Sequence, residues 1–523
     1  MGKATGFERG FQGGRKEFHL SIEARGRRCY NHTEDASAGH EEDSGWTRSS
    51  MDEKEIKQYE KMILTPPKRL IVTLAIPTII SMLISMVYNL VDAYFVGILG
   101  TSAAAAVGVV MSIQTVFQAF GFMFGHGAGS IISRMLSEGR REEADKMLTT
   151  SFLASLLVAG ILSILGLCLL EPLSIGLGST NTILPFSKIY GMYILLAGPG
   201  FAASCVLNNV MRYEGRASLA MIGLVAGGVL NMIGDPILMF ACRMEIHGAG
   251  LSTLISQYIS MFLLLIMFLT GRTMSKIRPA ALFKDPLKTI LLRFVHIIRN
   301  GFPSLMRQAL NSLSNIVLNN ASKPYGDAAI AAMTIAGRVL SFIISVAMGI
   351  GQGFQPVSAF NYSANKFRRF REAFSFAVIL GTCMMVVLGG IIFIFPGPVI
   401  GLFRDDPEVI EYGAVALRCM CIGALFIPLG TLNNMMFQSI GKSGIATLAS
   451  MMRSGLFYIP LVLILPLFLG YFGIQSAQMW ADILTAIASL PFLIYFFRHL
   501  PKEDQETHMD IAYRETIANG PRG

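Results

Sequence analysis

A series of apolar blocks runs through this chain, each about 20 residues long and separated from the next by short polar segments. As a helix, a block of this length crosses the roughly 30 Å hydrocarbon core of a bilayer. Helices satisfy their backbone hydrogen bonds internally, whereas open sheets cannot do so in lipid. The blocks lie at about 71–95, 105–128, 149–170, 187–210, 217–241, 250–270, 301–321, 330–353, 374–395, 411–436, 445–469 and 474–497. The sequence therefore predicts an all-α membrane protein with twelve transmembrane helices.

Charged residues make up only 15% of the chain, against roughly 25% in soluble domains, and the basic ones gather in alternate connections. The connections after even-numbered helices carry this excess, which includes Arg134, Arg140, Arg212, Arg216, Lys366, Lys442 and Arg453. Basic loops stay in the cytoplasm, so we expect a multi-pass plasma-membrane protein with both termini cytoplasmic. This topology explains the net charge of +9, and no nucleic-acid partner is expected.

The two halves of the chain repeat each other. Residues that recur at one constant offset are Pro77 and Pro303, Asn89 and Asn315, Gly100 and Gly326, and Gly127 and Gly353. Further on, the Tyr190-Gly191 pair returns as Tyr412-Gly413. Each half has six predicted helices, so both enter the membrane in the same orientation. We expect two pseudo-symmetric lobes, related by an axis along the membrane normal, around a central cavity.

Composition divides the chain into five segments. They are an extension at 1–50, an N-lobe at 51–270, a cytoplasmic linker at 271–294, a C-lobe at 295–497 and a cytoplasmic tail at 498–523. The extension is polar, with mixed charges and no apolar run, so it is neither a signal peptide nor a span. A charged stretch leads from Met51 directly into the first span, so we expect translation to begin at Met51. Both the extension and the tail are expected to be disordered.

The repeat differs in its acidic residues. When the two copies are aligned, Asp92 corresponds to Leu318 and Asp235 corresponds to Ile459. A charged side chain in mid-bilayer costs about 2.5–3.5 kcal/mol, so such residues are kept where they face a partner or a wet cavity. The pattern favours one coupling-ion site in the first half. Alternatively, Asp92 bonds locally near the external interface, and Asp235 compensates for the break at the proline that follows it.

Asn231 and Asp235 lie four residues apart and share one face of a helix. A carboxylate beside an amide oxygen suits Na⁺, which prefers oxygen ligands, or a proton exchanged on a buried acid. Pro236 has no N–H and leaves a carbonyl one turn back free as a further ligand. Pro77, on the helix that carries Asp92, should let that helix bend.

Two further basic residues, Arg307 and Arg338, lie near helix starts in the second half. We interpret them as interfacial anchors, with substrate or gating contact as the alternative. The sequence has no Walker A loop and no catalytic set, so neither ATP hydrolysis nor enzymatic activity is expected. No cofactor and no metal other than a coupling Na⁺ is expected.

Several motifs resemble one known family. They are Ile76-Pro-Thr-Ile-Ile, Asn89-Leu-Val-Asp-Ala-Tyr-Phe-Val-Gly-Ile-Leu-Gly, Gly127-Ala-Gly-Ser-Ile-Ile-Ser-Arg and Gly349-Ile-Gly-Gln-Gly-Phe-Gln-Pro-Val-Ser-Ala-Phe-Asn-Tyr-Ser-Ala. Together they are similar to motifs of the multidrug and toxic compound extrusion (MATE) transporters, over nearly all of 60–497. The resemblance implies twelve helices in two lobes and cation-coupled export of amphipathic, often cationic drugs.

Prokaryotic members of that family with an N-lobe ion site use acids and amides on helices one, four, five and six. Carried over by motif position, the ion-binding residues are Asp92, Asn208, Asn231, Asp235 and Thr253, and Pro77 is the helix-bending proline. Other members place acids on helices seven and ten. The stretches 304–311 and 424–434 contain none here, so an acidic C-lobe site is not expected.

These observations predict a monomeric secondary active antiporter. It would export amphipathic, cationic drug-like compounds in exchange for Na⁺ or H⁺, and its partners would be small organic molecules and membrane lipids. Two alternatives stay open. A flippase for a lipid-linked precursor would line its cavity with basic residues, and a non-transporting sensor or scaffold would not need the embedded acids.

Overall fold

The structure, a computed structural model, describes residues 51, 53–282 and 284–519. The predictions for residues 1–50 therefore lie outside the described residues. The described part of the chain is helical and contains no strand. Residues 52–514 form one compact unit, which carries both lobes.

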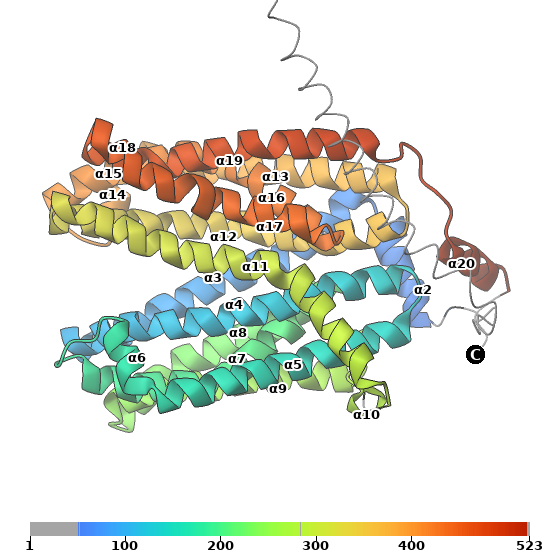
Figure 1. The fold of residues 1–523 in the computed structure, drawn as a ribbon, viewed down its shortest axis with the longest axis horizontal. Coiled ribbons are helices and arrows are strands. Elements are labelled where there is room, and N and C mark those ends of the chain that lie inside the picture. Colours follow the sequence, from blue (N-terminus) through green and yellow to red (C-terminus); the bar gives the residue numbers. More distant parts are fainter. Residues whose placement is uncertain (1–50, 52, 283, 520–523) are drawn as a thin grey trace, which may run out of the picture. The chain divides into compact units, whose positions relative to one another are not determined.

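Six long helices form the N-lobe, coloured blue to green in Figure 1. They are α3 (Pro67–Ile98), α4 (Thr101–Ser137), α5 (Arg141–Cys168), α7 (Leu184–Tyr213), α8 (Ala217–Pro236) and α9 (Glu245–Leu269). Shorter elements of this half are α2 (Glu53–Tyr59), α6 (Leu170–Gly176) and the π-helices η1 (Glu60–Leu64) and η2 (Ile237–Ala241). The π-helix η2 continues α8 directly after Pro236, where the missing N–H interrupts the α-helical hydrogen bonds.

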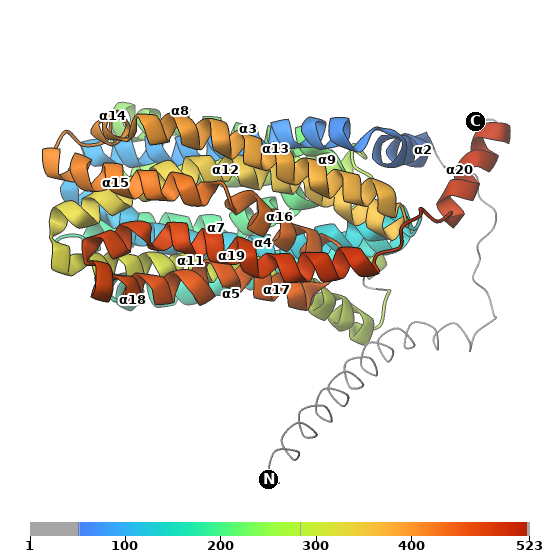
Figure 2. The same ribbon diagram turned by 90° about the horizontal axis from the view of Figure 1, so that it is seen from above.

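The C-lobe lies beside the N-lobe and repeats its order of helices (Figures 1 and 2). Its elements are α11 (Leu287–Ser322), α12 (Asp327–Ser363), α13 (Phe367–Ile394), α15 (Pro407–Ala424) with α16 (Ile427–Ser439), α17 (Ser443–Met451) with η4 (Met452–Tyr458) and α18 (Ile459–Leu469), and α19 (Tyr471–His499). Short helices α10 (Pro279–Leu282), η3 (Lys323–Tyr325) and α14 (Pro396–Gly401) lie in the connections. The two-lobed all-α fold predicted from the apolar blocks is confirmed.

Ten helices in the described residues are long and apolar enough to cross a membrane, or eleven if α15 and α16, which meet at 49°, count as one span. The remaining long helix, α11, does not reach that hydropathy because polar residues recur along one side of it. They are Arg307, Gln308, Asn311, Ser314 and Asn315. Their spacing places them on a single helix face. The seventh helix is therefore amphipathic, with its polar face available to line a site.

The recurring glycines make the same contact twice, once from each lobe. A Cβ atom on Gly353 of α12 would lie 2.7 Å from the Cα of Ala75 in α3, and one on Gly127 of α4 would lie 3.2 Å from the Cα of Gly301 in α11. Ala75 and Gly301 are themselves related by the offset of the repeat. Only glycine allows these helices to approach so closely, so the duplication preserves two symmetry-related contacts between the lobes.

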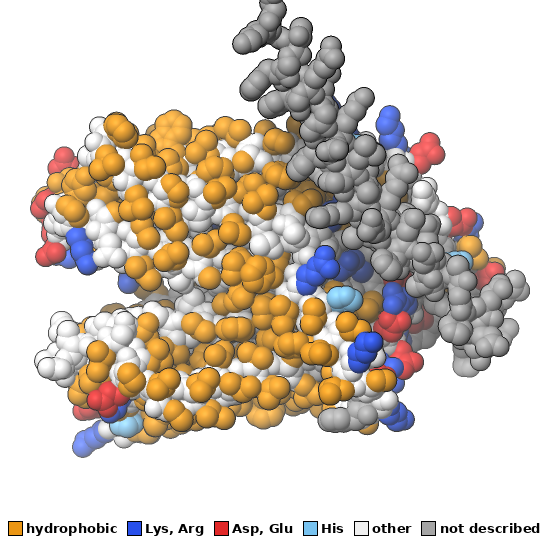
Figure 3. Space-filling model, in the orientation of Figure 1, with side chains coloured by type: hydrophobic (Ala, Val, Ile, Leu, Met, Phe, Trp, Pro, Cys, Tyr) orange, Lys and Arg blue, Asp and Glu red, His pale blue; other side chains and the backbone are white. Residues whose placement is uncertain are grey.

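The lobes are joined at one end and separated at the other. At the end where α2 lies, Asn361 donates to the backbone carbonyl of Met62 at 3.3 Å, and Asn300 donates to that of Gly127 at 3.2 Å. Between the two lobes, the surface is hollowed at the opposite end, near α6 and α14 (Figure 3). The predicted topology would place the closed end in the cytoplasm and the open end outside.

Two expectations are wrong. The tail was predicted to be disordered, but it forms α20 (His508–Asn519), because Asp510 accepts from Tyr59 and pairs with Lys366 at 2.8 Å. Arg453 was assigned to a connection between helices, but it lies within η4, inside the eleventh spanning helix.

Candidate functional site

Three of the predicted site residues meet between α8 and α9. The Nδ2 of Asn231 lies 3.1 Å from Asp235 Oδ1 and 3.2 Å from Thr253 Oγ1. The neighbouring Ser252 lies 3.3 Å from the same nitrogen and donates its own hydroxyl to the Asn231 carbonyl at 3.2 Å. All four side chains are buried, and Asp235 is 0% exposed. The helical spacing predicted for Asn231 and Asp235 therefore produces the expected shared face.

Asp92 reaches the same region from α3. The hydroxyl of Tyr190, on α7, donates to Asp92 Oδ2 at 3.1 Å, and Asp92 lies close enough to Asp235 to repel it electrostatically. Sequence reasoning missed Tyr190 and Ser252 as site residues. Tyr190 had one signal, its recurrence as Tyr412, but that repeat was taken only as part of the scaffold. We call Asp92, Tyr190, Asn231, Asp235 and Thr253 the N-lobe cluster.

Each carboxylate of this cluster has one oxygen without a partner. Asp92 Oδ1 and Asp235 Oδ2 are both buried and accept no hydrogen bond from the described residues. Buried polar atoms are normally satisfied, so two such oxygens on neighbouring acids leave two acceptors free for a further group. A proton or a hard cation such as Na⁺ fits these atoms. The described residues hold no group of three or more His, Cys, Asp or Glu that could bind a metal ion.

Asn208 does not join this cluster. Its Nδ2 donates to the carbonyl of Ala220 at 2.7 Å, which ties α7 to the start of α8. Asp235 lies 15 residues further along α8, or about 22 Å of helix rise. In the C-lobe, Asn434 makes the equivalent bond to Ala446 at 2.6 Å. Because the bond recurs in both lobes, its geometry fits a structural tie between helices.

Pro77 lies within α3, between the two positions at which α12 packs most closely. Its missing N–H leaves one gap in the hydrogen bonds of the helix. On either side, the backbones of Ala75 and Ile79 contact Gly353 and Gly349 of α12. The hydroxyl of Ser81 donates to the Pro77 carbonyl at 2.8 Å. A change of bend at Pro77 would therefore alter the contact between the lobes directly.

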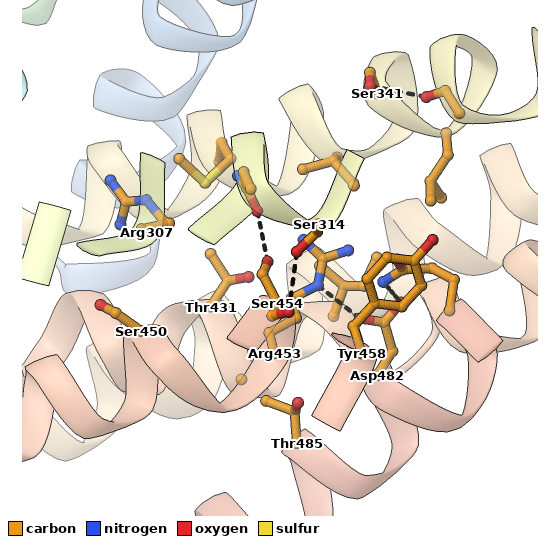
Figure 4. Close-up of a pocket in the computed structure, with 18 of the residues that line it drawn as sticks. Arg307, Ser314, Ser341, Thr431, Ser450, Arg453, Ser454, Tyr458, Asp482 and Thr485 are labelled. Atoms are coloured by element: carbon orange, nitrogen blue, oxygen red, sulfur yellow. Dashed lines mark hydrogen bonds and ion pairs between the residues drawn. The ribbon is translucent and has the colours of Figure 1, made fainter. Parts of the chain in front are cut away.

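The C-lobe contains a second polar site, which the sequence analysis did not foresee. A cavity of 340 Å³ lies between α11, α12, η4, α16 and α19, and we call it the C-lobe cavity (Figure 4). The polar face of α11 lines it, so the departure of α11 from the hydropathy of a simple span has a structural reason. Asn311 accepts from the Ser454 hydroxyl at 2.5 Å, and Ser314 donates to the Ser454 carbonyl at 2.9 Å. These bonds fix η4 against α11.

An ion pair lies in the wall of the C-lobe cavity. Arg453 Nε donates to Asp482 Oδ1 at 2.6 Å, and Gln478 Nε2 donates to Asp482 Oδ2 at 3.1 Å (Figure 4). The Asp482 side chain is 0% exposed and lies in the span α19. An embedded acid is therefore present in the second half as well, although comparison of the two copies singled out only Asp92 and Asp235. Asp482 differs from the N-lobe acids because both its oxygens are bonded, one of them to a fixed cation.

The two arginines that were interpreted as anchors differ in their surroundings. Arg338 is exposed and does not line the cavity. Arg307 lines the cavity, its Nη1 donates to Asn434 Oδ1 at 3.3 Å, and its Nη2 is buried without a partner among the described residues. The interpretation as an interfacial anchor is thus not supported for Arg307.

Comparison with known proteins follows the same division into halves. The family model described as MatE matches residues 77–237 and again residues 303–464. A relative named multidrug export protein MepA, from Staphylococcus saprophyticus, is 28% identical over 81% of this chain and 92% of its own length. The protein of the same name from Staphylococcus haemolyticus is 26% identical over 84% of this chain and 95% of its own length.

Solved structures share the fold. One, described as MATE in complex with MaL6, has a TM-score of 0.80 at 24% identity and covers 86% of this chain and 100% of its own. Another, described as the outward-facing conformation of a multidrug resistance MATE family transporter, has a TM-score of 0.80 at 24% identity and covers 87% and 100%.

Proposed function

The chain belongs to the MatE family of multidrug and toxic compound extrusion transporters, and on this premise we propose that it is a secondary active antiporter. It exports amphipathic, cationic drug-like compounds across the plasma membrane and takes up Na⁺ or H⁺ in exchange. It acts as a monomer, with both termini in the cytoplasm. The coupling ion binds at Asp92 and Asp235, with Asn231 and Thr253 beside them.

One observation carries this proposal. Among the described residues, Asp92 and Asp235 each keep a buried oxygen without a partner, while both oxygens of Asp482, an acid embedded in the C-lobe, are bonded. Burying unpaired charge is costly, so a site of this kind favours uptake of a cation or a proton. The Asn231 amide turns its NH₂ towards Asp235, and half a turn about its last side-chain bond would offer Na⁺ an oxygen instead. Tyr190 holds Asp92 in position.

Coupling follows from the position of Asp92 on α3. Neutralising Asp92 and Asp235 removes their repulsion and allows α3 to move towards α8 and α9. Pro77 lies 15 residues earlier on the same helix and concentrates the bend there. That bend displaces the residues that contact Gly349 and Gly353, so ion binding changes how the lobes meet at the closed end. An alternating-access cycle needs such a link between ion binding and lobe contact.

The acids disfavour both alternatives. A flippase for a lipid-linked precursor would need several basic residues to face the phosphates, whereas the N-lobe cluster is acidic and, in the C-lobe cavity, Asp482 neutralises Arg453 and leaves Arg307 as a single unpaired guanidinium among the lining residues. A sensor or scaffold would gain nothing from two unsatisfied carboxylates in its interior.

Purified protein in liposomes tests the proposal when Na⁺ and pH gradients are imposed separately. One of the two gradients should drive export of an organic cation, and Asp92→Asn and Asp235→Asn should each abolish it. As a matched control, Asp327→Asn removes an exposed acid from the start of α12 and should leave transport unchanged. Transport at the wild-type rate by both N-lobe variants would refute the site.

A further inference from the structure

We propose that the C-lobe cavity binds a carboxylate group of the exported molecule, with Arg307 as the residue that recognises it. This inference rests on the proposed export function and narrows its substrate class. The favoured substrates carry a carboxylate in addition to their cationic group. The cavity is thus the substrate site, whereas the N-lobe cluster is the ion site.

The charges that line the cavity do not balance. Two guanidinium groups, those of Arg307 and Arg453, and one carboxylate, that of Asp482, line the cavity, and no other charged side chain among the described residues lines it. Asp482 is bonded to Arg453, which leaves Arg307 without a counter-charge. The groups of the N-lobe that act electrostatically on Arg307 or feel its charge are Tyr213 and His126, neither of which is an acid.

Arg307 is prepared to receive an anion. Its Nη1 donates to Asn434, while its Nη2 is buried and has no partner in the part of the chain that the structure describes. Burying a donor without a partner costs its free energy of hydration, and no new hydrogen bond offsets that cost. The cost is larger for a charged donor. A guanidinium offers its donors in a planar fork that matches a carboxylate. One unpaired positive charge suits a monoanionic group, whereas a dianionic phosphate would leave an uncompensated negative charge in the cavity.

The size and lining of the cavity indicate an organic molecule. Its volume of 340 Å³ lies at the lower end of the roughly 300–1,000 Å³ of pockets that hold drug-sized ligands. An inorganic monoanion would leave most of that volume empty. Gln308, Asn315 and Thr431 offer amide and hydroxyl groups, and Leu340, Ile344 and Met420 offer apolar surface. An amphipathic molecule would use both.

The cavity also touches the helix that carries the ion site. Met86, on α3, is the lining residue that comes from the N-lobe. Its sulfur lies 3.2 Å from the Ser345 hydroxyl of α12. An occupant of the cavity would therefore contact α3 six residues from Asp92. This contact gives substrate and coupling ion a shared mechanical element.

A pair of dyes that differ in one group tests the proposal. Rhodamine 110 carries a free carboxylate, and rhodamine 123 is its methyl ester. Binding to purified protein in nanodiscs is measured by fluorescence anisotropy, without any gradient. Wild type should bind the acid about tenfold more tightly than the ester, as expected for a hydrogen bond between charged groups. Arg307→Gln should weaken binding of the acid about tenfold and leave the ester unchanged, and Arg307→Lys should restore part of the preference.

Arg338→Gln is the matched control, because it removes one positive charge from the same lobe outside the cavity. It should keep the preference for the acid. Equal binding of acid and ester by wild type, or an equal loss of both in Arg307→Gln, would overturn the proposal. Asp92→Asn separates it from the proposed function: that variant should lose ion-driven export and still prefer the acid. If it kept export as well, the ion site would fail while the carboxylate site stood.

Discussion

At the scale of residues, buried acids in this chain fall into two kinds that sequence position does not distinguish. Asp92 and Asp235 keep unsatisfied oxygens, whereas Asp482 is fully bonded to Arg453 and Gln478. On the proposed mechanism the first kind takes up the coupling ion, because no basic side chain among the described residues is paired with it. The second kind already holds a tethered cation and has no need of a mobile one. Partners therefore decide the chemistry of these acids.

Tyr190 positions the first acid, and its removal should change the affinity for the coupling ion. Tyr190→Phe deletes the hydrogen bond to Asp92, worth about 1 kcal/mol. If Na⁺ is the coupling ion, its half-saturating concentration should rise about fivefold because Asp92 is no longer held in place. If H⁺ is the coupling ion, its half-saturating concentration should fall about fivefold, because the lost bond stabilises the charged carboxylate. In either case the maximal rate should change little. Tyr412→Phe, at the recurring position in the C-lobe, is the control and should have no effect. An unchanged ion dependence in Tyr190→Phe would contradict the role assigned to its hydroxyl.

The ion pair of the C-lobe should behave as a unit. Arg453→Met leaves Asp482 buried and unpaired and should lower the free energy of unfolding by about 3–5 kcal/mol. Replacing both residues, with Arg453→Met and Asp482→Leu together, should recover most of that loss because no unpaired charge remains. Thermal unfolding in detergent measures both. A double variant that is no more stable than Arg453→Met would contradict the pairing.

At the scale of elements, the proline of α3 differs from the proline of α19 in what packs around it. Pro77 lies between two close contacts with α12, so the gap in its hydrogen bonds lies where α3 meets the other lobe. Pro491 also lies inside a helix, α19, but its side chain is exposed. The proposed role as a hinge therefore belongs to Pro77, whereas Pro491 is a break that its helix tolerates.

Replacing the hinge should separate stability from transport. Pro77→Ala restores a backbone hydrogen bond and removes a penalty of about 3 kcal/mol from the straight helix. The melting temperature should rise and transport should fall, while ion binding measured by ion-induced stabilisation persists. Pro491→Ala should change transport little. A Pro77→Ala variant that transports as well as wild type would show that α3 does not need to bend.

The seventh helix illustrates how far a sequence pattern reaches at this scale. Its apolar block at 301–321 correctly predicted a long helix, but α11 begins at Leu287, within the segment assigned to the linker. The sequence shows the polar residues of this helix, but it does not show that they line a cavity. The reason is physical: a stripe shows which residues share a face, but neighbouring helices decide whether that face meets lipid, another helix or a cavity.

At the scale of the whole molecule, two symmetry-related glycine contacts hold the lobes together at one end. The repeat preserves them because both lobes must close upon each other there. The open end has the hollow between the lobes, and the closed end has the hydrogen bonds that cross between them. In the proposed alternating-access cycle the open and closed ends exchange, so the glycine contacts should control the equilibrium between the two states.

A large side chain at such a contact should favour the opposite state. Gly353→Leu places atoms where the α3 backbone lies, and overpacking of this kind costs about 1–3 kcal/mol. The population of the state that is closed at this end should fall about 5- to 150-fold. Distances between spin labels on the two lobes report the shift. Gly390→Leu is the control, because a Cβ there meets nothing within 4 Å, and unchanged distances in Gly353→Leu would contradict the role of the contact.

The sequence by itself determined that the chain spans a bilayer, that it does so as helices, and that its two halves are duplicated. A bilayer accepts only elements that satisfy their own backbone bonds, so length and apolar character were sufficient to predict spans. The sequence also predicted that Asn231 and Asp235 lie together, because they are four residues apart on one helix. Only the tertiary structure decided which helix faces meet: it joined Tyr190 to Asp92, placed Asn208 away from them and paired Arg453 with Asp482. Those contacts depend on the rotation and packing of helices far apart in the chain, which no local pattern encodes.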